Sequence, residues 1–588
     1  MVDATGTGTT SYDDLDGVTA STRTYVGGLQ RIFNYQYFPD GSRQSLNSAA
    51  GFFSYVYDAN GRCTQFNNPS GTVNYAYFDD DALMSRTILN GSGGTVCHTD
   101  YTYNPASLVK TLTNRTSAGG NVLSSYDMSA PGSYDGVFNL KSMVANVTGV
   151  SNFTGSVTWD YDNLDRLTNE GGSRPQGLGG ANVYDNAGNP TTLRGIAGLT
   201  YNSDNQRTPS ANQWAYDGNG NPTWYRGREC TYDVGDRLAS MRQGNSWSIG
   251  YTYRADGLVA TRAKTVYVYN SRTGQWTPMG LPPVRFYHDG AEPLFEESGP
   301  ANAPTIAAVN VRGPDGLVAR RQGSTWTYYT FDQQGNVSQR LNASGTVVSS
   351  SVYDAYGAET TSGTAPTDAC GYNAQWGYWL DRDTGLYLCQ ARWYDPVTGR
   401  WVTRDPIGYA DGANLYGYCG GGPIGWTDVE GMQRARAGAR GRVWQPDDFV
   451  PFGHNPGGPE RDPYDPRIVV WPGTSSVPGA ATVVDGYSVD LPAGEDVHDF
   501  LYSPEQEYVD WYNHEMGHVE QARCLGPEWL PAYGRASVFG YKENPYEQKA
   551  DERAAAQPFG VRQPAFHRNP LVTGMPWIAR DLVRRNDA

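Results

Sequence analysis

Several residue types that define common protein classes are scarce in this 588-residue sequence. Seven cysteines are spread along the chain without a CxxC pair, so neither a disulfide framework nor a cysteine zinc site is expected. Lysine and arginine number 45 against 61 acidic residues, and the net charge of −16 argues against nucleic-acid binding, because no basic field displaces counterions. No run reaches the roughly 18 apolar residues of a membrane span. The first residues, MVDATGTGTTSYDD, have neither the basic end nor the apolar stretch of a secretory signal.

Aromatic residues and glycine are plentiful by contrast. The chain has 42 tyrosines, 16 tryptophans and 71 glycines, and aromatic residues make up 13% of it. Aromatic side chains bury large areas and favour pleated strands, whereas disordered chains contain few of them. The composition therefore predicts a folded, loop-rich and mainly β protein.

A short strand ending in Tyr-Asp, followed by a turn, recurs through residues 1–365. Clear copies are VYDANGR (Tyr57), WDYDNLDRL (Tyr161), VYDNAGNPT (Tyr184), AYDGNGNPT (Tyr216) and TYDVGDRLASM (Tyr232). Asp or Asn followed closely by Gly supplies the positive-φ positions that tight hairpin turns need. A repeat of this size cannot bury a face alone, so neighbouring hairpins are expected to join in a continuous sheet. The simpler alternative is an ordinary β-sandwich with tyrosine-rich strands.

These copies resemble the YD repeats of the RHS family, which includes bacterial polymorphic toxins, insecticidal toxin-complex C subunits and animal teneurins. Five further motifs strengthen the resemblance: DRDTGLY (Asp381–Tyr387), RWYDPVTGRW (Arg392–Trp401), RDPIG (Arg404–Gly408), NLYGY (Asn414–Tyr418) and DVEG (Asp428–Gly431). The resemblance implies a β-hairpin ribbon over residues 1–365 that spirals into a hollow shell. It also implies an RHS-associated core over residues 366–432.

In toxin members of that family the core acts as an intramolecular aspartyl protease that cuts just after the closing motif. The resemblance assigns Asp405 and Asp428 as the catalytic carboxylates, Arg404 as the residue that steadies them, and Met432–Gln433 as the bond cut. Two adjacent carboxyls resist joint ionisation, so one holds a proton while the other activates water. The closing motif DVEGM departs from the usual DPxGL. The alternative is that both aspartates only cap turns.

The composition changes after Met432, where the Tyr-Asp repeats cease. Residues 433–480 are predicted to be a Pro- and Gly-rich linker with the N-terminal segment of a toxin, and residues 481–588 a small α-rich (α+β) domain. A helix is predicted from its N-cap Ser503 to a stop at Gly526-Pro527, and it contains HEMGH. This spacing places His514 and His518 on one face, where both can bind Zn²⁺, and Glu515 between them can act as general base.

A third zinc ligand is expected from a second helix in ENPYEQKADERAA. The segment resembles the gluzincin arrangement, which implies Glu547 as the ligand and Asp551 as the residue that orients a ligating histidine. A competing interpretation is that Glu547 belongs to the capping box of its helix. Asp551, His567 and His498 are the alternative ligands.

Together these features predict an RHS-type toxin. The shell encloses its own C-terminal toxin, the core cleaves it free, and the released zinc metallopeptidase acts on a protein of a target cell. We expect synthesis in a bacterial cytoplasm without a signal peptide, export by a secretion or delivery machinery, and a cognate immunity protein. Two alternatives stay open: an adhesion or scaffold protein with an inactive tail, and a zinc hydrolase with a non-peptide substrate.

Overall fold

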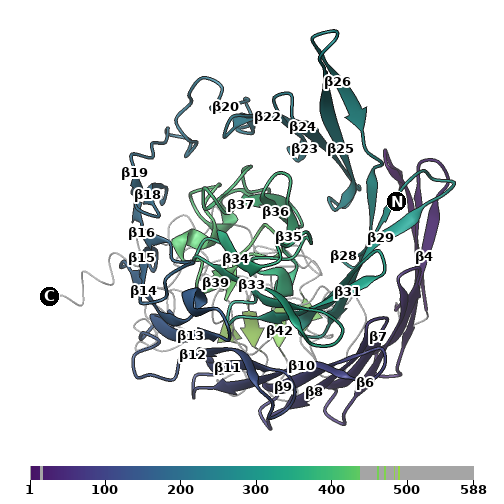
Figure 1. Ribbon diagram of the computed structural model, residues 1–588, viewed down its shortest axis with the longest axis vertical. Coiled ribbons are helices and arrows are strands. Elements are labelled where there is room, and N and C mark those ends of the chain that lie inside the picture. Colours follow the sequence, from purple (N-terminus) through teal and green to yellow (C-terminus); the bar gives the residue numbers. More distant parts are fainter. Residues whose placement is uncertain are drawn as a thin grey trace, which may run out of the picture. The chain divides into compact units, whose positions relative to one another are not determined.

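The computed structural model describes residues 2–13 and 17–436, together with four short strands between residues 460 and 490 (Figure 1). The chain divides into two compact units, Met1–Pro451 and Phe452–Ala588. The RHS-associated core predicted over residues 366–432 thus lies in the same unit as the repeats. The predicted zinc residues and the two helices that carry them lie outside the described residues.

The first unit begins with a sixteen-stranded sheet in which each strand pairs antiparallel with the next one in sequence. Its strands are β1 (Val2–Asp3), β2 (Gly6–Tyr12), β3 (Val18–Tyr25), β4 (Gln30–Tyr37), β5 (Arg43–Ser48), β6 (Gly51–Tyr57), β7 (Cys63–Asn68), β8 (Gly71–Tyr77), β9 (Leu83–Asn90), β10 (Thr95–Tyr103), β11 (Val109–Arg115), β12 (Val122–Asp127), β13 (Ser142–Val147), β14 (Gly155–Tyr161), β15 (Leu167–Gly171) and β16 (Gly180–Ala181).

Two further antiparallel sheets continue the ribbon. The small one contains β17 (Val183–Tyr184), β18 (Pro190–Leu193) and β19 (Ile196–Ala197). The fifteen-stranded one contains β20 (Trp214–Tyr216), β21 (Pro222–Tyr225), β22 (Arg228–Tyr232), β23 (Leu238–Gln243), β24 (Trp247–Tyr253), β25 (Val259–Asn270), β26 (Gln275–Gly280), β27 (Val284–Asp289), β28 (Glu292–Ser298), β29 (Thr305–Gly313), β30 (Gly316–Gln322), β31 (Thr325–Phe331), β32 (Val337–Leu341), β33 (Val347–Tyr353) and β34 (Glu359–Gly363). The prediction of a mainly β, hairpin-built chain is confirmed for the described residues.

The core motifs form short strands after this ribbon. A four-stranded meander contains β35 (Trp379–Asp381), β36 (Leu386–Cys389), β37 (Arg392–Asp395) and β38 (Arg400–Trp401), and a two-stranded pair contains β39 (Trp426–Thr427) and β40 (Ala435–Arg436). The helical segments of the described residues are 3₁₀ turns: η1 (Ser151–Phe153), η2 (Ala374–Trp376), η3 (Gly408–Asp411) and η4 (Cys419–Gly421). The second unit has a four-stranded sheet of β41 (Glu460–Arg461), β42 (Val469–Trp471), β43 (Thr482–Val483) and β44 (Ser488–Asp490).

The tyrosine of the Tyr-Asp repeat ties neighbouring hairpins together. The Tyr77 hydroxyl donates to the Cys63 carbonyl at 2.8 Å, and the Tyr253 hydroxyl donates to the Leu238 carbonyl at the same distance. In both cases the acceptor is the first residue of the preceding strand. These two repeats therefore satisfy a tyrosine hydroxyl on the neighbouring strand, which favours a continuous ribbon over separate sandwiches.

The aspartate of the repeat closes the turn that follows it. Asp162 Oδ1 accepts the backbone N–H groups of Leu164 at 2.9 Å and Arg166 at 3.0 Å. The fourth turn residue has positive φ, and the sequence predicts glycine for it. In this turn and in a later one that residue is an aspartate, Asp165 with φ of 58° and Asp236 with φ of 58°. Aspartate tolerates this conformation better than most side chains, so the turn forms without glycine.

Arginine at the end of the repeat links one turn to the next. The Nε of Arg166 donates to Asp162 Oδ2 at 2.7 Å, and its Nη1 donates to the Asp185 carbonyl at 3.0 Å. Its guanidinium also lies 4.9 Å from the ring centre of Tyr184. One side chain thus holds its own turn and the tyrosine of the following repeat.

The early and late strands of the first unit pack against each other through buried polar contacts as well as apolar ones. Arg86 on β9 pairs with Asp315 at 2.7 Å, and the hydroxyl of Tyr75 on β8 donates to the same carboxylate at 2.8 Å. The Tyr25 hydroxyl on β3 donates to the Phe286 carbonyl at 2.6 Å. Residues more than 200 positions apart in the chain therefore share one core.

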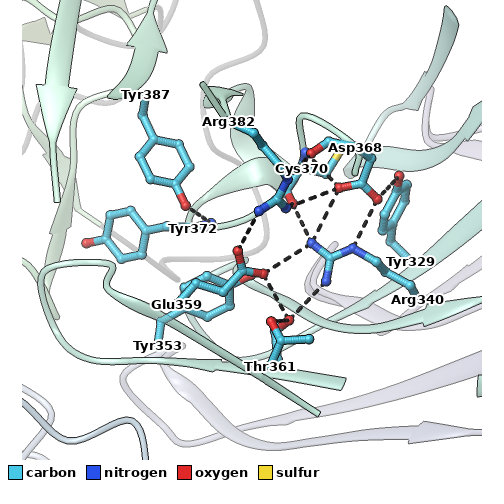
Figure 2. Close-up of polar contacts among 11 residues, drawn as sticks. Tyr329, Arg340, Tyr353, Glu359, Thr361, Asp368, Cys370, Tyr372, Arg382 and Tyr387 are labelled. Carbon is cyan, nitrogen blue, oxygen red and sulfur yellow. Dashed lines mark hydrogen bonds and ion pairs between the residues drawn. The ribbon is translucent and has the colours of Figure 1, made fainter. Parts of the chain in front are cut away.

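A buried charge network joins the last ribbon strands to the core motifs (Figure 2). Arg340 on β32 donates from Nε to Asp368 at 3.0 Å and from Nη2 to the Cys370 carbonyl at 2.6 Å and Glu359 at 3.3 Å. Arg382 pairs with Glu359 at 3.0 Å and with Asp368 at 3.5 Å. Burial alone would raise the pKa of Asp368, but the two guanidinium groups lower it below its usual value. Two arginines therefore neutralise two carboxylates at this junction.

Candidate active site

The core meander is fixed to the ribbon by aspartates of its own motifs. Asp381 accepts a forked pair of hydrogen bonds from Arg262 on β25, at 2.7 and 2.9 Å. Asp395 accepts from the Tyr225 hydroxyl at 2.9 Å and from Arg226 Nη1 at 3.1 Å. Such charge-assisted, partly forked contacts fix orientation as well as distance. These motif aspartates therefore hold the frame on which the candidate site is built.

Asp405 and Asp428, the two predicted catalytic carboxylates, lie together in the structure. Both contact the same nitrogen, Nη2 of Arg392, at 2.8 Å from Asp405 and 3.2 Å from Asp428. The side chains of Arg392, Asp405 and Asp428 are 2%, 6% and 1% exposed. Two buried carboxyls therefore share one cation in a site shielded from water.

Arg392 is held in place by the surrounding aromatic and backbone groups. Its guanidinium lies 4.2 Å from the ring centre of Trp401, and its Nη1 donates to the Leu415 carbonyl at 3.4 Å. The backbone of Asp428 is fixed by Tyr378, whose hydroxyl accepts the Asp428 N–H at 3.0 Å and lies 2.9 Å from the Asp428 carbonyl. The geometry of the site therefore depends on the packing of the core, as a preorganised site requires.

Both carboxyls hold their protons more strongly than an ordinary aspartic acid. Burial raises the pKa of Asp405 to about 6, although Arg392 opposes the increase, and the Asp428 charge adds to it. Burial likewise raises the pKa of Asp428 to about 6 against Arg392, with a further contribution from the charge of Asp411. Interacting carboxyls titrate as one unit, so the pair holds a proton up to about pH 6 and loses it as the pH rises further.

The chain segment that precedes the predicted cleavage position lies directly on this site. Arg392 Nε donates to the Gly431 carbonyl, and the Met432 N–H donates to Asp428 Oδ1 at 3.0 Å. The Ala391 N–H donates to the Glu430 carbonyl at 3.0 Å. The same guanidinium and carboxylate that make up the site thus bind the peptide group between Gly431 and Met432, next to the predicted bond.

The turn contacts expected from the simpler alternative are also present. Asp405 Oδ1 accepts the Ile407 N–H at 3.0 Å, and Asp428 Oδ1 accepts the Met432 N–H across its own turn. Turn capping accounts for one oxygen of each carboxylate. It does not account for the other oxygen of each, which contacts Arg392.

The structure corrects the position predicted for Arg404. This side chain lies beside Gly220 and the Tyr416 hydroxyl, where a β-carbon on Gly220 would collide with its guanidinium. Among the described residues it forms no ion pair with Asp405 or Asp428. Although Arg404 precedes Asp405 in the sequence, its side chain points away from the two carboxylates. The arginine that contacts both of them is Arg392.

Two residues of the site are absent from the sequence prediction. Arg392 lies in the RWYDP motif, but its motif gives no indication that it contacts aspartates far along the chain. Asp411 stands in η3, where its charge raises the pKa of Asp428, and the charge of Asp405 in turn raises the pKa of Asp411. No signal in the sequence distinguishes Asp411 from the other acidic residues of turns.

The described residues contain no group of three or more His, Cys, Asp or Glu side chains placed to hold a metal ion. The predicted ligands His514, His518 and Glu547, with Glu515 and Asp551, lie outside the described residues. No helix within the described residues is long and apolar enough to cross a membrane.

Comparisons with known proteins point to toxins. No protein-family model matches the chain. The tRNA3(Ser)-specific nuclease WapA of Bacillus spizizenii is 25% identical over 285 residues, which are 46% of this chain and 12% of that protein. Double-stranded DNA deaminase toxin A of Burkholderia cenocepacia is 45% identical over 56 residues, which are 10% of this chain and 4% of the toxin.

The fold also matches a solved toxin structure. The Tc holotoxin pore of Photorhabdus luminescens, which carries a TccC3 variant, superposes with a TM-score of 0.56 and 16% identity over 75% of this chain and 24% of that chain. The chain thus spans at most about a quarter of the length of these three proteins. The chain is thus similar in sequence to a nuclease and to a deaminase toxin, and it shares the β fold of this Tc toxin structure.

Proposed function

We propose that this chain is a self-processing toxin whose β shell encloses a C-terminal effector and whose core cuts the chain at Met432–Gln433. The observation that carries the proposal is the Arg392 guanidinium between Asp405 and Asp428, with Gly431 and Met432 bound to the same side chains. A turn-capping role requires no buried cation shared by two carboxylates, whereas proteolysis requires carboxyls that differ in protonation.

The geometry supports hydrolysis by a pair of carboxyls that share one proton. The ionised carboxylate takes a proton from water as the water oxygen attacks the carbonyl carbon of Met432. The protonated carboxyl gives its proton to the Gln433 nitrogen as the C–N bond breaks. Arg392 stays charged throughout, keeps the two carboxyls together and restrains the Gly431 carbonyl beside the reacting peptide. The products are a new carboxylate on Met432 and a new amino group on Gln433.

The proposal includes enclosure and delivery because an active effector would damage the cell that makes it. A hydrolase has to be kept from the proteins of the producing cell, and a shell that holds the cut fragment does this until delivery. The toxin relatives and the shell fold support this part of the proposal. We propose synthesis in a bacterial cytoplasm, transfer by a secretion or delivery machinery, and a cognate immunity protein.

The effector assignment rests on residues of the tail alone. The relatives are named as a nuclease and a deaminase, so a related shell accompanies effectors of different chemistry. The motif HEMGH and the helix predicted downstream of it support a zinc peptidase, with His514, His518 and Glu547 as ligands, Asp551 as the residue that orients a histidine, and Glu515 as general base. If zinc binds there, it would supply an acidified water and polarise the substrate carbonyl.

Intact mass under denaturing conditions tests self-cleavage. The wild-type chain is expected to split into Met1–Met432 and Gln433–Ala588, whereas Asp405→Asn and Asp428→Asn stay at 64.3 kDa. Asp236→Asn is the matched control, because asparagine also tolerates the turn conformation of this exposed aspartate. An uncut wild-type chain would overturn the proposal in favour of a scaffold. A first fragment that ends at Gly431 would move the bond by one residue.

Metal content of the purified full chain tests the effector. One zinc per chain is expected, lost in His514→Ala and retained in Glu515→Gln and in the control His454→Ala. A wild-type chain without zinc contradicts the assignment. A chain that binds zinc but cuts no bond in a mixture of denatured proteins would instead support a non-peptide substrate.

A further inference from the structure

Arg434, two residues beyond the predicted cleavage position, has a binding site of its own in the core. Its Nε lies 3.8 Å from Asp411 Oδ1, and its guanidinium lies 5.1 Å from the ring centre of Trp426. Its Nη1 approaches Gly420 so closely that a β-carbon there would collide with it. An anion, an aromatic face and a glycine thus surround one arginine side chain.

The main chain around Arg434 is held as well. β40 (Ala435–Arg436) pairs antiparallel with β39 (Trp426–Thr427), in the register Ala435 to Thr427 and Arg436 to Trp426. On the other side of the predicted bond, the Met432 N–H is bound to Asp428. The Met432–Gln433 peptide therefore spans a short gap between two anchored points.

Asp411 connects this arrangement to the catalytic pair. It ends η3, the turn that starts where the Gly408 N–H donates to the Asp405 carbonyl at 3.0 Å. The carboxylate that holds Arg434 therefore stands on the same short segment as the carboxylate proposed to act on the bond. A shift of η3 would move both groups together.

We propose that Asp411 and Trp426 form a subsite for Arg434 that positions the leaving side of the Met432–Gln433 bond. This inference rests on the proposed self-cleavage. Asp411 is a positioning residue, since it contacts Arg434 and not the bond that breaks. The subsite determines which sequence the core cuts well: an arginine two residues after the bond.

The expected change in the cleavage rate depends on the solvent exposure of the Arg434 and Asp411 side chains. The side chains of Arg434 and Asp411 are 38% and 20% exposed, so solvent weakens their attraction. A partly exposed ion pair with one cation–π contact corresponds to roughly a three- to tenfold change in rate if its contribution is realised in the transition state. Loss of the subsite is expected to slow self-cleavage by that factor without stopping it.

Pulse-labelled cell-free synthesis of the full chain measures the rate, because the 64.3 kDa precursor can be followed from the moment of synthesis. We expect Asp411→Asn and Arg434→Gln each to slow the loss of precursor about three- to tenfold. The double variant is expected to be no slower than the slower single variant, because both changes remove one interaction. Arg242→Gln is the matched control, since Arg242 forms another partly exposed 3.8 Å pair, with Glu229 on a neighbouring strand.

The outcomes separate this inference from the proposed function. A wild-type chain that cleaves while either single variant keeps the wild-type rate would overturn the subsite and leave self-cleavage intact. Slowing factors that multiply in the double variant would also overturn it, because they show two independent effects. A wild-type chain that never cleaves removes both proposals together.

Discussion

Self-cleavage is predicted to be fastest near pH 6 and to decline as the pH rises. The reaction needs one protonated carboxyl in the Asp405–Asp428 pair, and burial raises the pKa of each to about 6. The protonated form is therefore present below pH 6 and is lost as the pH rises through that value. From pH 6 to pH 8 its population falls roughly fiftyfold, and the rate is expected to fall with it. Precursor made at pH 8 and moved to buffers between pH 5 and 8 gives the profile.

Arg392→Gln provides the internal control for this prediction. Arg392 lowers the pKa of both carboxyls, so its removal should move the declining limb to higher pH while the rate itself falls. Asp405→Asn should abolish the limb together with the reaction. A rate that is constant from pH 6 to 8, or that increases with pH, would refute the assignment of a shared proton to this pair.

Three substitutions test the frame around the site. Arg340→Met leaves Arg382 as the one arginine that pairs with Asp368 and Glu359, and it should lower the unfolding free energy by about 3 kcal/mol. The control Arg242→Met should change the unfolding free energy by less than about 0.5 kcal/mol. The midpoints of urea unfolding compare the two variants. Asp162→Ala removes the acceptor of the Leu164 and Arg166 N–H groups and should cost about 1 kcal/mol in the same assay, and no change in midpoint would contradict the turn role. Gly357→Ala, at φ +89° with a β-carbon 2.7 Å from the Tyr372 ring, should cost more than Gly188→Ala, at φ +77° with no atom within 4 Å; equal midpoints would contradict this.

The repeat architecture could be read from the sequence because its contacts are local. Asp162 and Arg166 belong to one turn, and Tyr77 contacts the start of the preceding strand, so residue types within a short window specify each hairpin. One turn position differs from this prediction. The pattern predicts glycine at the positive-φ position, but Asp165 and Asp236 occupy it, since the turn is set by the aspartate that begins it and tolerates either residue.

The residues of the candidate site could be predicted from the sequence only in part. The resemblance of the closing motifs pointed to Asp405 and Asp428, and it assigned Arg404 to them because Arg404 precedes Asp405 in the matched RDP motif. Arg392 reaches Asp428 from 36 residues away, through the packing of the core strands on Trp401. Sequence patterns encode turns and strand periodicity, whereas the direction of a particular side chain depends on what packs beside it. The sequence by itself therefore determines the turns and strands of this protein, whereas the tertiary structure decides that Arg392 is the cation between Asp405 and Asp428.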